Sequence, residues 1–378
     1  MDATGEKGRL MRPASRRVTI ADVAAALGVT KGTVSRAMNG YRDISPSTRR
    51  RVERKAKEMG YRPLSHAQAI RTGRVRALGL VLQINEHDAQ RPFLTDFLAG
   101  VSMAASAENW TLTVATAGSD RETLATISRL IEEHKADGFI LPRTLLIDTR
   151  VALLRGAGVP FIMYGRTGDA TGCAWYDVLG ENAMKEAVLR LSGQGHRRIG
   201  FVNGGRGYSY SKLRLEGYLD GLKAAGLRRD EALVVEGAVT TDQGQRAAQQ
   251  LLQGAEPPTA VIYAVDMAAL GLYRAAAAAG LRVGRDLSVI GYDGIPEGAH
   301  ATPQLTSFAV NSRQAGASLA RLLIRRIRGA APEQLRETDA ARLVVRGSDG
   351  PPVLSSAEIY AHMRARTLST NQTVEEDQ

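Results

Sequence analysis

Hydrogen-bonding side chains follow one another closely in TKGTVSRAMN, residues 30 to 39. Thr30 can cap a short helix whose apolar side contains Val34 and Met38, which leaves hydroxyl, amide and charged groups on the other faces. Such groups on a helix can hydrogen-bond phosphates and the edges of bases in a duplex groove. The spacing therefore predicts recognition of DNA. The alternative is an ordinary helical hairpin with solvated charges.

A second set of polar residues follows apolar, strand-like runs further along the chain. It comprises Gln83, Arg143, Arg166, Asp266 and Asp293. Ligands of open α/β sheets bind outside the carboxyl ends of the strands, and carboxylates and guanidinium groups make paired, charge-assisted hydrogen bonds to neighbouring hydroxyls. The set therefore predicts a sugar site. Two alternatives remain open: Asp266 and Asp293 cap a helix and a turn, or the arginines bind an acidic or phosphorylated sugar.

Motifs for catalysis are missing from the sequence. It contains no H-E-x-x-H, G-x-S-x-G or P-loop, and the glycine-rich loop at 203–207 lacks the spacing of a dinucleotide cradle. The six histidines are scattered, and we interpret His196 as structural. Cys173 is the single cysteine, which excludes an intramolecular disulfide and fits a reducing cytoplasm. We expect no catalytic residue, no metal and no cofactor.

Three short helices would present the first set of polar residues. Thr19 caps the first helix, whose apolar face includes Val23 and Leu27, and Gly28 ends it. Ser45 and Pro46 open a third helix that is coated with arginine and lysine. Two short helices joined by one glycine-containing turn have the helix-turn-helix geometry.

The net charge of +11 lies entirely in the first fifth of the 378 residues. Residues 1–76 carry 18 Lys and Arg against six Asp and Glu, a net of +12, and the remainder carries 32 against 33. This asymmetry indicates that the N-terminal module binds a polyanion. Nowhere do 18 consecutive apolar residues occur, and no apolar run follows the basic N-terminus. We therefore expect a cytoplasmic protein with no membrane partner.

Nine short apolar runs between residues 77 and 310 alternate with helical stretches. They lie at 77–82, 111–115, 138–141, 161–164, 199–203, 232–236, 260–263, 287–293 and 307–310. This rhythm predicts doubly wound parallel sheets, and nine strands favour two lobes with a cleft over one compact sheet.

The segments VTIADVAAALGVTKGTVSRAMNG, ISPSTRRRVERKAKEMGYRP and AQAIRTGR resemble the headpiece and hinge of the lactose/galactose repressor family of bacterial transcription regulators. The resemblance extends over residues 18 to 348. It implies a homodimer that binds nearly palindromic operator DNA, and a two-lobed core, similar to periplasmic binding proteins, that senses a small molecule. A sugar-responsive repressor of carbohydrate genes is the function we expect; a corepressor-type response is the alternative.

The resemblance also divides the chain into a headpiece at 18–63, a hinge at 64–76 and a core at 77–348. The basic, polar composition of residues 1–17 predicts a disordered arm, and the polar tail at 349–378 lies beyond the family pattern. The first lobe would take 77–176 with a helix at 313–329, and the second 177–305 with a final strand at 342–346. We expect the tail to be mobile, although residues 355–366 could form a helix.

Candidate DNA contacts follow from the polar helix face and the resemblance together. They are Thr19, Thr30, Lys31, Gly32, Thr33, Ser35, Arg36, Asn39, Tyr61, Ile70 and Arg71. The resemblance implies that Lys31, Gly32 and Arg36 face bases. It also implies that Ile70 of the hinge is an apolar wedge in the minor groove, where the family usually has leucine. A flexible polar linker is the alternative for the hinge.

Candidate effector contacts are extended in the same way. The resemblance adds Arg214 as an effector-contacting arginine, Phe93 as an aromatic lining residue, and a hydroxyl-binding role for Asp293. Val265 stands where family members often have asparagine, so one hydrogen bond to the ligand is missing.

Three other classes of protein fit the sequence less well. A transport binding protein needs a secretion signal, and an α/β enzyme needs a nucleophile or a cofactor motif. A nonspecific DNA binder has no use for a sensing core.

Overall fold

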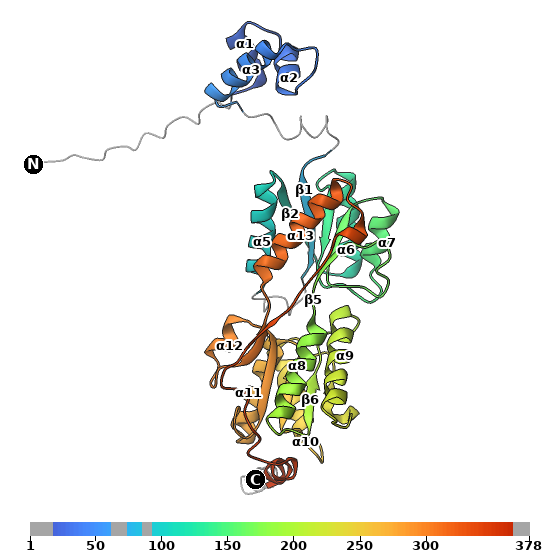
Figure 1. Cartoon of the computed structure of the whole chain (residues 1–378), viewed down its shortest axis with the longest axis vertical. Helices are drawn as coiled ribbons and strands as arrows, with labels where there is room; N and C mark the ends of the chain where they lie inside the picture. Colours follow the sequence, from blue (N-terminus) through green and yellow to red (C-terminus); the bar gives the residue numbers. More distant parts are fainter. Residues whose placement is uncertain (1–17, 62–73, 85–92, 366–378) are drawn as a thin grey trace, which may run out of the picture. The chain divides into compact units, whose positions relative to one another are not determined.

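The computed structural model describes residues 18–61, 74–84 and 93–365. The chain divides into two compact units after Val75. Among the described residues, the N-terminal unit contains three α-helices and the C-terminal unit two six-stranded sheets. Figure 1 shows helices flanking the sheets of the C-terminal unit. The expected arm at 1–17, the hinge residues Ile70 and Arg71, and the end of the tail lie outside the described residues.

The N-terminal unit is the expected three-helix headpiece. Its helices are α1 (Ile20–Leu27), α2 (Lys31–Met38) and α3 (Pro46–Glu58). Thr19 and Asp22 form a capping box at α1, and Gly28 ends that helix in the left-handed conformation that glycine adopts without strain. Val23, Val34 and Val52, one from each helix, are fully buried and form its core.

The first lobe contains a six-stranded parallel sheet in the order β11-β5-β4-β3-β1-β2, in which β11 is Arg336–Asp339. Alternate residues of β1 point to opposite faces: Leu80 packs beneath α5 and α13 (Ser312–Ile327), whereas Val81 packs beneath α6 and α7. Its elements before the crossing are β1 (Ala77–Gln83), α5 (Phe93–Ala107), β2 (Thr111–Ala117), α6 (Asp120–Glu132), β3 (Gly138–Leu141), α7 (Thr149–Gly156), β4 (Phe161–Tyr164) and β5 (Trp175–Val178).

The second lobe has the same plan, with the strand order β12-β10-β9-β8-β6-β7. Among these strands only β12 (Arg342–Val344) is antiparallel to its neighbour. One face is covered by α8 and α9 and the other by α10 and α11. Its elements are α8 (Gly180–Gly193), β6 (Ile199–Val202), α9 (Ser209–Ala224), β7 (Val234–Val235), α10 (Thr241–Gln253), β8 (Ala260–Tyr263), α11 (Asp266–Ala279), β9 (Ser288–Asp293), α12 (Pro296–His300) and β10 (Thr306–Ala309). Short 3-10 turns lie at Glu231–Leu233 and Pro332–Gln334.

The chain crosses between the lobes three times. The strands predicted from the sequence did not include two that lie next to these crossings, β5 and β11. After β10 it returns to the first lobe as α13 (Ser312–Ile327) and β11 (Arg336–Asp339), then ends in the second sheet as β12 (Arg342–Val344). The nine expected runs omitted β5 and β11, because Asp177 interrupts the short run WYDV and RETD is polar throughout. The strand expected at 232–236 is reduced to Val234–Val235.

Residues 350–365 pack against the second lobe, so the expectation of a mobile tail was wrong for this part. Residues 356–365 are helical, and Ile359 is fully buried in the core between α10 and α11. His196 has the structural role expected, because its ring contacts Gly350 O at 2.9 Å and Thr259 Oγ1 at 2.8 Å. Apolar burial and these hydrogen bonds fix the start of the tail. Among the described residues, no helix is long and apolar enough to cross a membrane.

Candidate functional site

The headpiece exposes its candidate base-reading residues on α2. Lys31, Gly32 and Arg36 are exposed, whereas Val34 and Ala37 of the same helix are buried. A helix with this division presents one polar face to a partner and one apolar face to its own core. Thr33, Ser35 and Asn39 lie half-buried at the border between the two faces.

Three further candidates in the headpiece have local structural partners. The Thr19 hydroxyl accepts a hydrogen bond from Asp22 N at 3.3 Å, and the Thr30 hydroxyl accepts one from Thr33 N at 3.1 Å. Both threonines are therefore N-caps, as their positions predicted. Tyr61 is half-buried against the headpiece core. Contacts of these three residues with DNA remain a prediction.

A cavity of about 420 Å³ lies between the two lobes of the C-terminal unit. It is lined from the first lobe by residues after β1, β3 and β4, and from the second by the starts of α8 and α9 and the end of β9. Four of the expected effector residues line it, namely Arg143, Arg166, Arg214 and Asp293. The sheets thus bring together residues more than a hundred positions apart, at the edge where open α/β sheets bind ligands.

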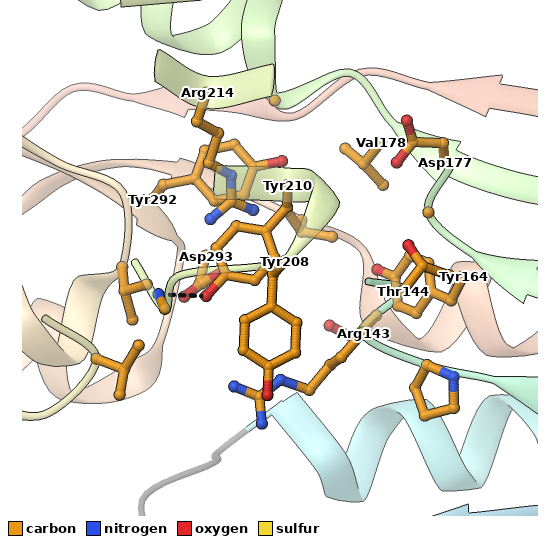
Figure 2. A pocket seen from close by; sticks show the side chains of 18 of the residues that line it. Arg143, Thr144, Tyr164, Asp177, Val178, Tyr208, Tyr210, Arg214, Tyr292 and Asp293 are labelled. Atoms are coloured by element: carbon orange, nitrogen blue, oxygen red, sulfur yellow. Dashed lines mark hydrogen bonds between the residues drawn. The ribbon is translucent and has the colours of Figure 1, made fainter. Parts of the chain in front are cut away.

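Arg214 is held between aromatic rings in this cavity (Figure 2). Its guanidinium carbon lies 3.8 Å from the centre of the Tyr292 ring and 4.7 Å from that of Tyr210, and Nη1 donates a hydrogen bond to Ala264 O. Gly180 permits this placement, because a Cβ there would lie 2.9 Å from Arg214 Nε. The guanidinium is therefore fixed in direction before any ligand arrives.

Arg166 forms a charge cluster with two carboxylates on the other side of the cavity. Nε donates to Asp177 Oδ2 and Nη2 to Glu181 Oε1, both at 2.5 Å. Burial raises the pKa of Asp177, and the charge of Arg166 opposes that shift. Because Arg166 is already bonded to both carboxylates, it is less suited to neutralising a ligand anion than its sequence position suggested.

Asp293 brings a carboxylate to the cavity from the end of β9. Burial raises its pKa to about 7, and the nearby charge of Arg214 opposes the shift. Its φ of 126° lies in the left-handed region that non-glycine residues rarely occupy. A carboxyl group held in this way titrates near neutral pH and can accept hydrogen bonds from hydroxyls when ionised.

Asp266 and Gln83 do not line the cavity. Asp266 is fully buried behind the wall, where its carboxylate accepts hydrogen bonds from Gly294 N at 2.7 Å, Ile295 N at 3.0 Å and Ser307 Oγ at 2.8 Å. It fixes the loop after β9 and so supports Asp293; the assignment of Asp266 as an effector contact was wrong. Gln83 is half-buried at the end of β1, outside the lining. Phe93 begins α5, and its side chain lies outside the described residues.

Tyrosines form a wall of the cavity that the sequence analysis missed. Tyr208 and Tyr210 stack with ring centres 5.5 Å apart, and Arg143 lies over the Tyr208 ring at 4.8 Å, as Figure 2 shows. Tyr164 lines the first-lobe side. The run GRGYSY, two tyrosines directly after a strand and a glycine-rich loop, was the signal that could have found them.

Backbone hydrogen bonds join the lobes at the cavity. Leu146 N donates to Gly207 O and Ser209 N donates to Thr144 O, each at 3.0 Å, so that Leu145 and Tyr208 form an antiparallel bridge. We call these two segments, residues 144–146 and 207–209, the latch. Its two hydrogen bonds join main-chain groups of the two lobes, next to the contact of Arg143 with the Tyr208 ring.

Three buried polar atoms around the cavity have no hydrogen-bond partner among the described residues. They are Glu181 Oε2, Ser209 Oγ and Arg214 Nε. Buried polar atoms without partners are rare because each costs free energy, and they mark places where a ligand or water completes the hydrogen bonding. Glu181 and Arg214 line the cavity, so its lining contains one acceptor and one donor whose hydrogen bonding is incomplete.

Comparison with known proteins assigns both units. Residues 19–64 match the family model "Bacterial regulatory proteins, lacI family", and residues 188–348 match "Periplasmic binding protein-like domain". The HTH-type transcriptional regulator CelR of Thermobifida fusca is 35% identical over 336 residues, which cover 88% of this chain and 98% of that protein. The HTH-type transcriptional regulator AglR of Rhizobium meliloti (strain 1021) is 34% identical, with 88% and 95% covered.

A solved structure resembles the whole arrangement. The transcriptional regulator CelR–cellobiose complex superposes with a TM-score of 0.69 at 34% identity, covering 88% of this chain and all of that one. The headpiece, the two-lobed core and the order in which they follow one another are thus shared along almost the full chain. The protein belongs to the lacI family of bacterial regulatory proteins and is a DNA-binding transcriptional regulator.

Proposed function

We propose that the cleft binds a neutral sugar of two linked rings, and that this sugar controls whether the headpieces occupy an operator. The observation that carries the proposal is the pairing of a tyrosine wall with fixed charged groups whose signs balance. The lining contains three guanidinium groups, Arg143, Arg166 and Arg214, and three carboxyl groups, Asp177, Glu181 and Asp293. A lining whose charges nearly balance suits a ligand without net charge.

The cavity contains groups that can bind both the hydroxyls and the ring faces of a sugar. The flat, apolar faces of pyranose rings pack well on tyrosine, and carboxylates and guanidinium groups fix the orientation through hydroxyls. A volume of about 420 Å³ exceeds the need of one hexose and accommodates two. The similarity to a regulator that was solved with cellobiose supports this choice.

An acidic or phosphorylated sugar is a poorer fit. Arg166 is bonded to Asp177 and Glu181, and a phosphate next to these carboxylates would meet like charge. A neutral ligand meets no such charge repulsion from Asp177 and Glu181. We therefore rank the acidic ligand below the neutral one.

Regulation follows from linkage between the two units. We infer that two protomers hold their headpieces at a spacing that matches two half-sites of a nearly palindromic operator, and that sugar binding changes the relative position of the lobes. A ligand with a ~100-fold preference for one state supplies ~2.7 kcal/mol, enough to switch operator occupancy. Release by the sugar, and hence repression without it, is the direction we propose. A regulator that binds chromosomal DNA in a bacterium works in the cytoplasm.

Titration calorimetry with matched sugars tests the ligand class. Cellobiose, melibiose and maltose form the neutral set, and cellobiose 6-phosphate and cellobionate form a charged set of similar size. We expect binding within the neutral set and none within the charged set. Tight binding of a charged sugar together with no binding of any neutral one would refute the proposal.

A further inference from the structure

Arg36, the exposed arginine of α2, contacts an acidic residue that lies outside this helix. Its guanidinium forms an ion pair with Asp43 and lies 5.5 Å from the centre of the Tyr41 ring. The two charged side chains are 54% and 45% exposed, so a DNA base edge can still reach the guanidinium. The pair therefore belongs to the surface that the headpiece offers to DNA.

The turn that carries Asp43 is anchored to the recognition helix. Tyr41 N donates to Arg36 O at 3.1 Å, and Ile44 N donates to Tyr41 O at 3.2 Å. Arg49 of α3 donates through Nη2 to the same carbonyl oxygen of Tyr41 at 2.9 Å. Backbone and side-chain bonds thus fix where the turn places its carboxylate.

General affinity for DNA does not account for an aspartate at this place. Residues 18–61 contain four acidic residues in a strongly basic module. Asp22 completes the α1 capping box and Glu58 pairs with Lys55, whereas Glu53 stands exposed on α3. A negative charge beside α2 weakens the attraction to phosphates, so the attraction to DNA gives no reason for an aspartate at this position.

The chemistry of guanidinium shows what that effect can be. A guanidinium has five N–H donors, and bidentate recognition of guanine O6 and N7 uses only two of them. A carboxylate can hold the remaining donors and keep the fork in one orientation, while the aromatic ring fixes its plane. The carboxylate also disfavours a rearrangement in which the arginine turns away to neutralise a backbone phosphate.

We propose that Asp43 is a positioning residue for base recognition: it holds Arg36 for a base edge and keeps it off the phosphates, so it sets discrimination between operator and other DNA. This inference rests on the proposed base-reading role of Arg36. It predicts opposite effects of Asp43 on two quantities. Asp43 lowers affinity for all DNA through its charge and raises the ratio of operator to nonspecific affinity through its geometry.

Asp43→Asn in the full-length protein tests the inference, with Glu53→Gln as a control that removes the same charge elsewhere in the headpiece. Binding is measured by fluorescence anisotropy on a duplex from the gene's own upstream region and on a scrambled duplex of equal composition. Both variants should bind the scrambled duplex more tightly. Only Asp43→Asn should reduce the discrimination ratio, by about two- to fivefold, the range for an exposed ion pair.

Arg36→Ala and the double variant Arg36→Ala/Asp43→Asn complete a cycle. We expect Asp43→Asn to leave discrimination unchanged once Arg36 is absent. Equal ratios for Asp43→Asn and Glu53→Gln, while Arg36→Ala still lowers the ratio, would overturn the role of Asp43 alone. An unchanged ratio for Arg36→Ala would overturn both the inference and the base-reading role on which it rests.

Discussion

Leu145 of the first lobe and Tyr208 of the second are paired as an antiparallel backbone bridge across the cleft. The hydrogen bonds beside this bridge, Leu146 N to Gly207 O and Ser209 N to Thr144 O, join main-chain groups and involve no ligand. The protein's own backbone hydrogen bonds therefore help to hold the two lobes in this arrangement. These bonds favour the present arrangement of the lobes, so a ligand that binds this arrangement should bind more tightly when the bonds are intact.

Ser209→Pro tests the latch with little damage to the fold. Ser209 is the first residue of α9, where proline is tolerated, and Tyr208 before it has φ −77° and ψ 140°, the conformation that a following proline favours. Compared with Ser209→Ala, which keeps the N–H, the proline variant should bind sugar ~2- to 12-fold more weakly, as expected for one lost hydrogen bond. Calorimetry measures the difference, and stopped-flow fluorescence should show faster sugar dissociation. Identical affinities and rates for the two variants would rule out a role for this bond.

Sugar affinity should depend on pH through Asp293. With a pKa of about 7, the Asp293 side chain changes from a neutral acid to a carboxylate with two charged acceptor oxygens, so sugar affinity should rise by up to about tenfold between about pH 6 and about pH 8. Asp293→Asn should bind weakly at every pH and lose this dependence. A wild-type protein with a flat pH profile over the same interval would contradict the assignment.

The same group should affect stability with the opposite sign. The folded pKa lies above the ordinary value of 3.8, so the folded state binds more protons than the unfolded state between these values. The contribution of Asp293 is therefore fully present below about pH 4 and is lost as pH rises through about 7. Urea unfolding of the sugar-free protein should show Asp293→Asn gaining stability relative to wild type across this interval. A constant difference would count against the raised pKa.

Ile359 should contribute to the stability of the second lobe. Its side chain is fully buried in the core between α10 and α11, so Ile359→Ala should lower the free energy of unfolding by ~2–5 kcal/mol. The exposed neighbour Ala361, changed to serine, is the matched control and should stay within ~0.5 kcal/mol of wild type. Denaturant unfolding followed by circular dichroism gives both values. If Ile359→Ala were as stable as its control, the docking of residues 350–365 would be wrong.

Arg36 and Arg51 should affect DNA binding in different ways. Arg36→Ala should relax operator choice by ~1 to 3 kcal/mol, because a bidentate contact to a base edge is lost. Arg51→Ala, on the exposed face of α3, should weaken all DNA alike and reduce the dependence on salt. Anisotropy titrations at several salt concentrations separate the two effects. Equal losses on operator and scrambled duplex for Arg36→Ala would refute its assignment to bases.

The sequence predicted the elements whose residues follow a simple local pattern. The headpiece helices have caps and apolar spacing of their own, and strands such as β3 and β8 are continuous apolar runs. Strand β11 escaped prediction because RETD is charged and all four of its residues are exposed at the sheet edge. Its pairing with β5 depends on a partner more than 150 residues away, which no local pattern records.

The candidate site shows the same division. Arg143, Arg166, Arg214 and Asp293 were found because polar residues at strand ends or in a family pattern are conspicuous. The roles of these residues were harder to predict from the sequence. Arg166 is hydrogen-bonded to carboxylates from β5 and α8, and neither element is adjacent to it in sequence. Asp266 was misassigned because its position after a strand does not reveal that the loop after β9 folds back over its carboxylate.

Operator binding with and without a sugar tests the central claim most directly. Full-length protein is titrated onto a duplex from its own upstream region and onto a scrambled duplex at moderate ionic strength, first alone and then with saturating cellobiose, melibiose or maltose. The account predicts clear preference for the upstream duplex, and at least one of these neutral sugars should lower that affinity to the nonspecific level. Equal affinity for both duplexes in every condition would contradict it.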